Sequence, residues 1–147
     1  MIARIARESL ALILLAGLAS VATWFAWGGP ERGEACDPAT LEPGQICFAE
    51  AARLPHVLWV DARPRALWEK NGFPGSILLT DDSSEDFALL MGEAFESLAN
   101  AEAVVIYCAT SGCGSSEAVA EKIKELEILP PEKVYVLAGG WQSLESP

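Results

Sequence analysis

Two cysteines in a short run of small residues are the first candidates for chemistry. Cys108 and Cys113 stand five positions apart in the segment Cys-Ala-Thr-Ser-Gly-Cys-Gly-Ser, residues 108–115. A run of Gly and Ser can curl so that successive backbone N–H groups point inward and bind an anion. A thiol held there has a lowered pKa and reacts as the thiolate, and the same N–H groups would stabilise a persulfide or an oxyanion. Cys108 is therefore a candidate nucleophile.

The N–H groups of this nest would come from the residues that follow Cys108: Ala109, Thr110, Ser111, Gly112, Gly114 and Ser115. The residues alone also allow a plainer interpretation. In that interpretation Cys108 is an unreactive thiol at the end of a strand, and the segment after it is an ordinary turn.

The flanking elements would place this segment at an edge where sites are common. Residues 104–107 form an apolar run typical of a buried strand, and residues 115–126 carry Val119, Ile123 and Leu126 on one helical face. In open α/β sheets, ligands bind beyond the carboxyl ends of the strands. The segment between this strand and this helix is expected at such an end.

The remaining pattern from residue 46 onward predicts an α/β fold. Short apolar runs alternate with helical stretches, which indicates one parallel sheet with helices on both faces. The expected strands are 46–48, 57–60, 76–79, 104–107 and 134–137, and the expected helices are 49–54, 64–70, 81–99 and 115–126. Residues 46–147 are long enough to bury one such core.

The N-terminal region predicts a membrane segment. Residues 9–27 contain no charged residue, and a helix of these 19 residues would be roughly 28 Å long, about one hydrocarbon core. Arg4 and Arg7 before the run favour a cytoplasmic N-terminus, and Trp24 and Trp27 suit the far interface. We expect residues 1–27 to anchor the chain in a bacterial inner membrane by a single pass, with the domain on the periplasmic or extracytoplasmic side.

Two other interpretations of residues 1–27 stay open. A cleaved signal peptide is one, since residues 20–22 offer a small-residue cleavage site, but the apolar run continues past it. The other is a buried helix of a soluble domain, which the lack of any polar face disfavours.

The charge of the chain excludes one class of partner. The formal net charge is −11 over 147 residues, and residues 28–147 carry −12 because the N-terminal region is basic. Affinity for phosphate backbones depends on Lys and Arg, so no nucleic-acid partner is expected.

A second cysteine pair flanks the end of a Gly- and Pro-rich segment, residues 28–45, which is interpreted as a linker. In an oxidising compartment Cys36 and Cys47 could form a disulfide worth about 3 kcal/mol. The four cysteines together do not have the spacing of a zinc site, so no metal is expected.

Four motifs give the chain a family resemblance. Trp59-Val-Asp-Ala-Arg63 is similar to an Asp-x-Arg signature, and Asn71-Gly-Phe-Pro-Gly-Ser76 to a Gly-His-Ile-Pro-Gly-Ala motif. Residues 104–108 resemble a strand ending in a catalytic cysteine, and residues 136–141 a closing segment with Gly-Gly. In this order the motifs resemble the single-domain rhodanese family. The resemblance implies the rhodanese fold, no cofactor, and Cys108 as the acceptor of sulfane sulfur in a persulfide cycle.

The departures from the family pattern restrict this activity. Gly72 replaces the motif's His, at a structural cost. Members that use thiosulfate commonly carry Arg or Lys in the active loop, and residues 109–115 contain neither. Related phosphatases need an Arg where this chain has Gly114, so phosphatase activity is not expected.

Cys113 lies where the family's loop commonly has Arg. A curled loop would bring it near Cys108, so a disulfide between them is geometrically reasonable. Our hypothesis is that Cys113 is a resolving thiol that attacks a persulfide or sulfenate on Cys108. The alternative is that Cys113 is only a small residue that fits the loop.

The sequence thus predicts a sulfurtransferase that passes sulfane sulfur from a small donor through Cys108 to a thiol acceptor. Two alternatives stay open: a thiol–disulfide redox protein that uses Cys108 and Cys113, and an inactive rhodanese module for binding or sensing. Asp61 and Arg63 are expected to form a structural charge pair near the site, and His56 is assigned a surface role.

Overall fold

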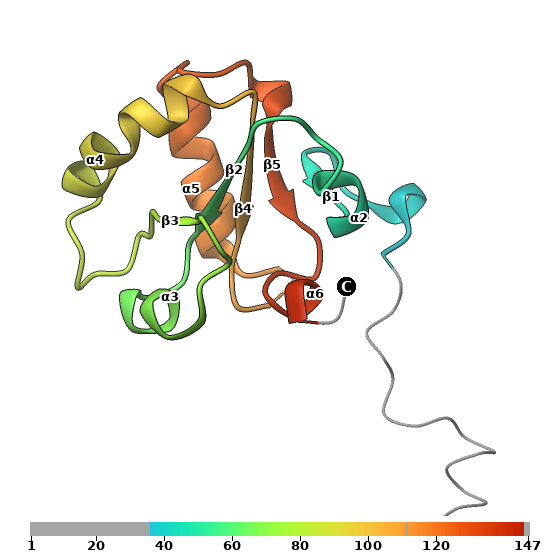
Figure 1. Ribbon diagram of the computed structural model, residues 1–147, viewed down its shortest axis with the longest axis horizontal. Coiled ribbons are helices and arrows are strands. Elements are labelled where there is room, and N and C mark those ends of the chain that lie inside the picture. The colour runs from blue at the N-terminus through green and yellow to red at the C-terminus, as the bar shows by residue number, and fades with distance from the viewer. Residues whose placement is uncertain (1–35, 111, 146–147) are drawn as a thin grey trace, which may run out of the picture. The chain divides into compact units, whose positions relative to one another are not determined.

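One sheet of five parallel strands forms the centre of the molecule (Figure 1). The computed structural model describes residues 36–110 and 112–145. The strands run in the spatial order β1-β5-β4-β2-β3, and every neighbouring pair is parallel. Their bounds are β1 Gln45–Ile46, β2 Val57–Asp61, β3 Ile77–Leu78, β4 Ala103–Tyr107 and β5 Val134–Leu137. The predicted parallel α/β sheet is confirmed.

The central strand β4 explains why the sheet needs cover on both sides. All five of its residues are buried, and its side chains alternate between two apolar clusters. Val104 and Ile106 face one cluster, whereas Val105 and Tyr107 face the other. A strand of this kind, apolar on both faces, is typical of parallel sheets.

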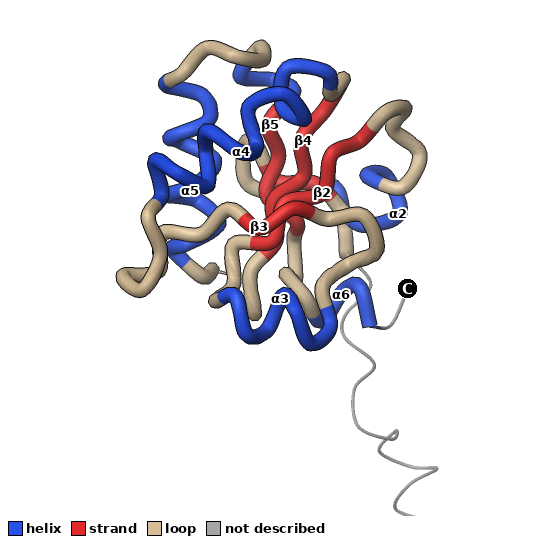
Figure 2. The backbone as a smooth tube through the Cα atoms, turned by 60° about the vertical axis from the view of Figure 1, so that its left-hand side comes forward, coloured by secondary structure: helices blue, strands red, loops and turns tan. Residues whose placement is uncertain are grey.

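Helices supply that cover on both faces, as predicted (Figure 2). The longer helices α4 and α5 contribute to the first cluster through residues such as Leu98 and Val119, and the short helices α2 and α6 pack against the second through Ala51 and Leu144. The helices are α2 Phe48–Ala51, α3 Arg65–Asn71, α4 Phe87–Asn100, α5 Gly114–Glu125 and α6 Gln142–Glu145, with 3-10 turns at Pro38–Thr40 and Pro131–Lys133.

Helix α4 begins later than the sequence pattern predicts. The expected helix started at residue 81, but α4 begins at Phe87. Asp86 is the N-cap, where its side chain accepts hydrogen bonds from the N–H groups of Ala88 and Leu89. An Asp that satisfies these first N–H groups fixes the start of a helix. The acids at residues 81–85, which suit the first turn of a helix, belong instead to the loop before α4.

Residues 36–45, the last part of the predicted linker, are attached to the domain. The expected disulfide joins Cys36 to Cys47, with a Cα–Cα distance of 5.7 Å. Strand β1 pairs with β5 through Gln45 opposite Val136. This stretch therefore holds the edge of the sheet by one covalent bond and one strand pairing.

The predicted membrane segment, residues 9–27, lies outside the described residues. Within the part of the chain that the structure describes, none of the helices combines the length and the apolar character that a membrane crossing needs.

Candidate active site

A buried group of charged and aromatic side chains lies where β2 and β4 end. Asp61 closes β2 opposite Tyr107, which closes β4. The carboxylate of Asp61 accepts hydrogen bonds from Arg63 Nη2 at 2.7 Å, from Arg63 Nε at 3.0 Å and from the Tyr107 hydroxyl at 2.7 Å. Asp61 is fully buried and Arg63 is 3% exposed, so this ion pair is shielded from water. The predicted charge pair is present.

The same network holds residues 71–76, the segment before β3, by hydrogen bonds. The N–H of Phe73 donates to the Tyr107 hydroxyl oxygen at 2.9 Å, and Arg63 Nη1 donates to Asn71 Oδ1 at 3.3 Å. The first bond links the motif at residues 71–76 to the end of β4, and the second links it to Arg63, just after β2. The sequence analysis does not identify Tyr107; its position next to Cys108, on a strand buried on both faces, is the signal that could have found it.

The ionisation of these groups follows from their burial and their neighbours. Burial raises the pKa of Tyr107 to about 12, and the nearby Asp61 carboxylate adds to the shift, so the hydroxyl remains a hydrogen-bond donor at neutral pH. Burial disfavours the charged form of Arg63, but the hydrogen bonds and charge of Asp61 outweigh it and raise the pKa of the guanidinium. Arg63 is therefore a cation committed to Asp61.

Trp141 connects this network to Cys108. The Arg63 guanidinium lies 4.0 Å from the centroid of the Trp141 ring, a cation–π contact. The backbone N–H of Trp141 donates to the carbonyl oxygen of Cys108 at 2.7 Å. We call Asp61, Arg63, Tyr107 and Trp141 the platform.

Two glycines permit close approaches around the platform. At Gly140, which has φ +56°, a Cβ would lie 2.7 Å from the Cys108 carbonyl oxygen. At Gly72 a Cβ would lie 2.7 Å from Trp68 Cδ1. The second contact explains why Gly occupies the position of the family's His: the neighbouring indole leaves no room for a side chain.

Cys108 and Cys113, which we call the sulfur pair, lie together at the start of α5. They are joined by a disulfide, with their Cα atoms 6.2 Å apart. Cys108 directly follows β4 and is 4% exposed, whereas Cys113 is partly exposed and occupies the N-cap position of α5. No side chain caps the helix there, although Ser116 Oγ donates to the Cys113 carbonyl at 3.0 Å. The pair thus lies at the positive end of a helix dipole.

Comparison with known proteins gives this arrangement a family. The model of the rhodanese-like domain matches residues 48–146, about two thirds of the chain. The chain belongs to the rhodanese-like domain family. The match confirms the family resemblance and includes both the platform and the sulfur pair. No curated protein is significantly similar in sequence.

A similar solved structure is the N-terminal domain of a putative ATP/GTP binding protein from Clostridium difficile 630. It is 19% identical, the alignment covers 69% of this chain and 95% of that one, and the TM-score is 0.48.

Of the predicted loop residues of this rhodanese-like domain, only some face solvent. Ala109, Thr110, Gly112 and Gly114 are exposed, Ser115 is partly buried, and Ser111 lies outside the described residues. Cys36 and Cys47 are separate from the sulfur pair: they hold β1 at the edge of the sheet, and β5 lies between that strand and β4.

His56 is remote from the sulfur pair. It precedes β2 at the amino end of the sheet, its side chain is 77% exposed, and its Nε2 lies 4.0 Å from a Glu102 carboxylate oxygen. Among the described residues no three His, Cys, Asp or Glu side chains come together in a way that could hold a metal ion.

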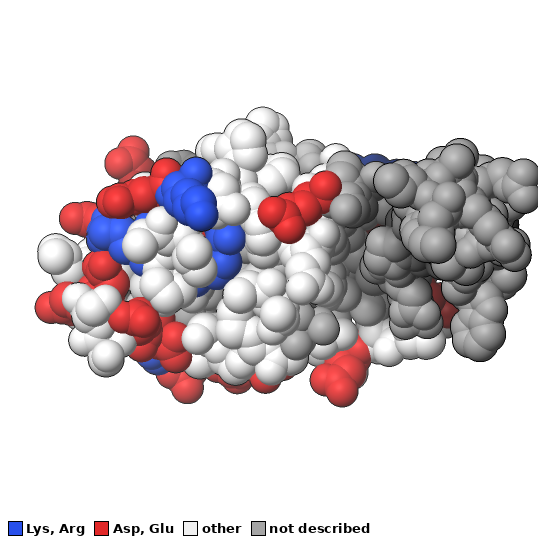
Figure 3. Space-filling model, turned by 90° about the horizontal axis from the view of Figure 1, so that it is seen from below, with Lys and Arg blue, Asp and Glu red and all other residues white. Residues whose placement is uncertain are grey.

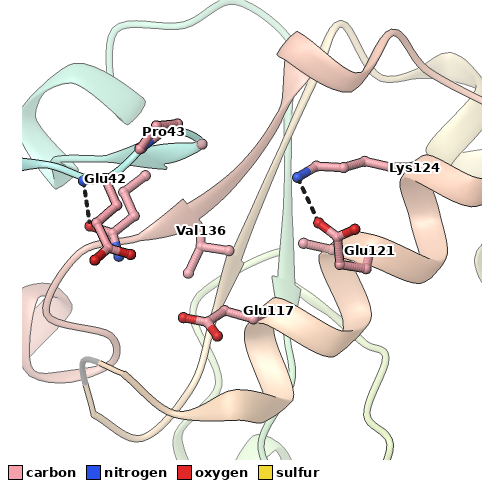
Figure 4. A pocket seen from close by; sticks show the side chains of 9 residues that line it. Glu42, Pro43, Glu117, Glu121, Lys124 and Val136 are labelled. Atoms are coloured by element: carbon pink, nitrogen blue, oxygen red, sulfur yellow. Dashed lines mark hydrogen bonds and ion pairs between the residues drawn. The ribbon is translucent and has the colours of Figure 1, made fainter.

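The surface of the domain carries charges of both signs, and a cavity lies along helix α5. Figure 3 views the end toward which the strands run, where charged side chains of both signs gather at one side and uncharged surface lies beside them. A cavity of about 250 Å³ lies along α5 (Figure 4). It is lined by Glu42, Pro43, Gly44, Gln45, Glu117, Ala120, Glu121, Lys124 and Val136.

Lys124 is the one cation of that lining, and its Nζ is paired with Glu121 at 3.2 Å. Glu117 extends from the first turn of α5, close in sequence to Cys113. Residues 109–115 themselves contain no Lys or Arg that would attract an anionic ligand.

Proposed function

We propose that this rhodanese-like domain is a sulfurtransferase that carries sulfane sulfur as a persulfide on Cys108. The observation that carries the proposal is the position of Cys108, which directly follows the buried strand β4 and lies beside the uncapped start of α5. Helix N-termini favour a thiolate and its negatively charged products. The platform holds the backbone of Cys108 through Trp141 and fixes the nucleophile against the sheet.

The transfer needs two displacements at sulfur. The Cys108 thiolate attacks the sulfane sulfur of a donor, the sulfur–sulfur bond of the donor breaks, and the remainder leaves with the electron pair. An acceptor thiolate then attacks the outer sulfur of the Cys108 persulfide and regenerates the Cys108 thiolate. No cofactor takes part in either step. Because no Arg or Lys is present at residues 109–115, we expect a thiol persulfide to be a better donor than thiosulfate.

Cys113 provides a second reaction by which the Cys108 persulfide can be consumed. Its thiolate attacks the inner sulfur, on Cys108, and displaces hydrosulfide while the Cys108–Cys113 disulfide forms. The Cα atoms of the pair are 6.2 Å apart, within the range that a disulfide spans. In this branch Cys113 is a resolving thiol, and the disulfide is the product of one turnover.

The disulfide also supports a second candidate function. A protein that cycles only between the dithiol and the disulfide would exchange electrons with thiols and carry no sulfur. The two functions differ in one observable, a covalent sulfur atom on Cys108, because thiol–disulfide exchange never forms that species.

The experiment is intact-mass spectrometry of the full chain. The chain is reduced, freed of reductant and offered a thiol persulfide or thiosulfate. We expect a mass gain of one sulfur atom in the Cys113→Ser variant, a shorter-lived adduct in the wild type, and none in the Cys108→Ser variant. Reversible disulfide formation without any sulfur adduct would favour the redox protein. A sulfur pair that forms neither a sulfur adduct nor a reversible disulfide would favour a binding or sensing module.

We also propose that the domain acts outside the cytoplasm, held at the inner membrane by residues 1–27. The Cys36–Cys47 disulfide supports an oxidising compartment, where such bonds persist. Protease treatment of spheroplasts tests this: the domain should be digested without lysis of the cells, and protection until lysis would contradict the proposal.

A further inference from the structure

The two cysteines of the sulfur pair differ in how far an outside reagent can reach them. Cys108 is 4% exposed, its carbonyl oxygen accepts the Trp141 N–H at 2.7 Å, and the Gly140 backbone packs against it. Cys113 is partly exposed at the N-cap of α5. One sulfur thus belongs to a residue enclosed by the sheet and the closing segment, and the other to a residue at the surface.

This difference matters because thiol–disulfide exchange is directional. A thiolate must reach one sulfur of the disulfide, and the other sulfur leaves with the electron pair. Attack on Cys113 needs contact only with a partly exposed residue, whereas Cys108 is almost fully buried and an outside thiol reaches it only if its surroundings move.

We propose that a dithiol reductant reopens the sulfur pair by attacking Cys113, with Cys108 as the leaving group. The first partner thiolate forms a bond to the Cys113 sulfur, the Cys108–Cys113 bond breaks, and Cys108 departs as the thiolate. The second partner thiolate then attacks the partner's own sulfur in the mixed disulfide and releases Cys113. The partner supplies two electrons and ends as a disulfide.

This inference deepens the proposed function and rests on it for its place in the cycle. Resolution by Cys113 releases hydrosulfide and leaves a disulfide, so each such turnover needs two electrons from outside. A reaction that supplies a reduced dithiol must therefore accompany sulfur release. Attack at Cys113 also leaves Cys108 free as a thiolate, which is the form that accepts the next sulfur.

The acid in the first turn of α5, Glu117, and the net charge of the chain indicate the charge of that partner. Glu117 is exposed in the first turn of α5, and the chain carries a net charge of −11. Opposite charge on the partner would raise the rate of encounter, and salt would reduce that gain. The partner is thus a dithiol protein whose reactive face is basic.

The test locates the mixed disulfide that a neutral thiol forms. The oxidised full chain is exposed briefly to millimolar 2-mercaptoethanol, quenched with iodoacetamide and mapped by peptide fragmentation. We expect mercaptoethanol on Cys113 and the alkyl group on Cys108, in about tenfold excess over the reverse arrangement. An equal distribution, an excess of mercaptoethanol on Cys108, or a pair that this thiol does not open would overturn the inference.

A second arm tests the partner's charge with two small thiols, cysteamine and 3-mercaptopropionate. Rates of opening are compared per thiolate, at low and high salt. We expect the cationic thiol to react several-fold faster than the anionic one at low salt, with the ratio reduced in Glu117→Gln and at high salt. Equal rates at low salt would overturn the assignment of a basic partner.

The outcome is distinguishable from failure of the proposed function. Reduction is mapped on the oxidised chain without any sulfur donor, whereas persulfide formation is measured on the reduced chain. Mercaptoethanol on Cys113 together with no sulfur adduct on Cys108 would reject the sulfurtransferase and retain the direction of reduction.

Discussion

The platform and the sulfur pair meet at Cys108 but differ in burial and in charge. The platform is buried and charged, and its Asp61 carboxylate is surrounded by donors from Arg63 and Tyr107. The sulfur pair is uncharged, partly at the surface, and joined by a single covalent bond. In the proposed function the platform supplies stability and position, and the sulfur pair supplies the chemistry.

The largest expected effect comes from breaking the platform. Asp61→Asn keeps the shape of the side chain but leaves the buried Arg63 cation without its counter-charge. We expect a loss of about 3–5 kcal/mol in the free energy of unfolding, as is typical when one partner of a buried pair is removed. Urea denaturation with circular dichroism measures it.

The matched control for this change is Glu85→Gln. Glu85 accepts two hydrogen bonds of 2.8 Å from Arg65, so the same chemical group is removed from an Arg–carboxylate pair that is only partly buried. The stability of this variant should stay close to that of the wild type. Folded Asp61→Asn should still form the Cys108 persulfide; a variant of full stability that cannot accept sulfur would reverse the assigned tasks.

A smaller effect is expected where the platform segment approaches the sulfur pair, at Gly140. In Gly140→Ala the new Cβ would lie 2.7 Å from the Cys108 carbonyl oxygen, on a backbone with φ +56°. We expect a loss of about 1–3 kcal/mol in the free energy of unfolding and faster reduction of the sulfur pair, because the backbone around Cys108 must move. Thermal unfolding and a timed reduction assay measure the two effects.

Gly92→Ala provides the control for Gly140→Ala. Gly92 lies within α4, and a Cβ there meets no atom within 4 Å. A helical Gly→Ala change of this kind stabilises by up to about 1 kcal/mol. If both variants gave the same stability and the same reduction rate, the closing segment would not hold Cys108.

Much of the fold follows from local patterns, because a strand buried on both faces leaves a continuous apolar run. The run at residues 104–107 therefore located β4 to within one residue. The start of α4 could not be predicted from such a pattern, because the acids of residues 81–86 suit both the first turn of a helix and the loop before it. Only the hydrogen bonds to Asp86 decide between the two.

The candidate site was predictable only in part. Cys108, Cys113, Asp61 and Arg63 carry recognisable chemistry at recognisable positions, so the sequence indicates them. The joining of Arg63 to Cys108 through Trp141 depends on a contact between segments far apart in the chain. No local sequence pattern encodes such a contact, so the sequence alone does not give the role of Trp141.

The smallest expected effect concerns the acid titration of the Arg65–Glu85 ion pair, which is partly exposed whereas the platform's ion pair is buried. The hydrogen bonds from Arg65 lower the pKa of Glu85 below its ordinary value of 4.5. A carboxyl whose pKa is depressed in the folded state stabilises the fold above its unfolded pKa, and this stabilisation is lost as the pH falls through the folded value. Carbon-detected NMR titration should show Glu85 ionising below an ordinary Glu, and Arg65→Met should move its pKa upward. An unchanged Glu85 titration in that variant would mean that the ion pair does not persist in solution, and the contrast between exposed and shielded pairs would then rest on the platform alone.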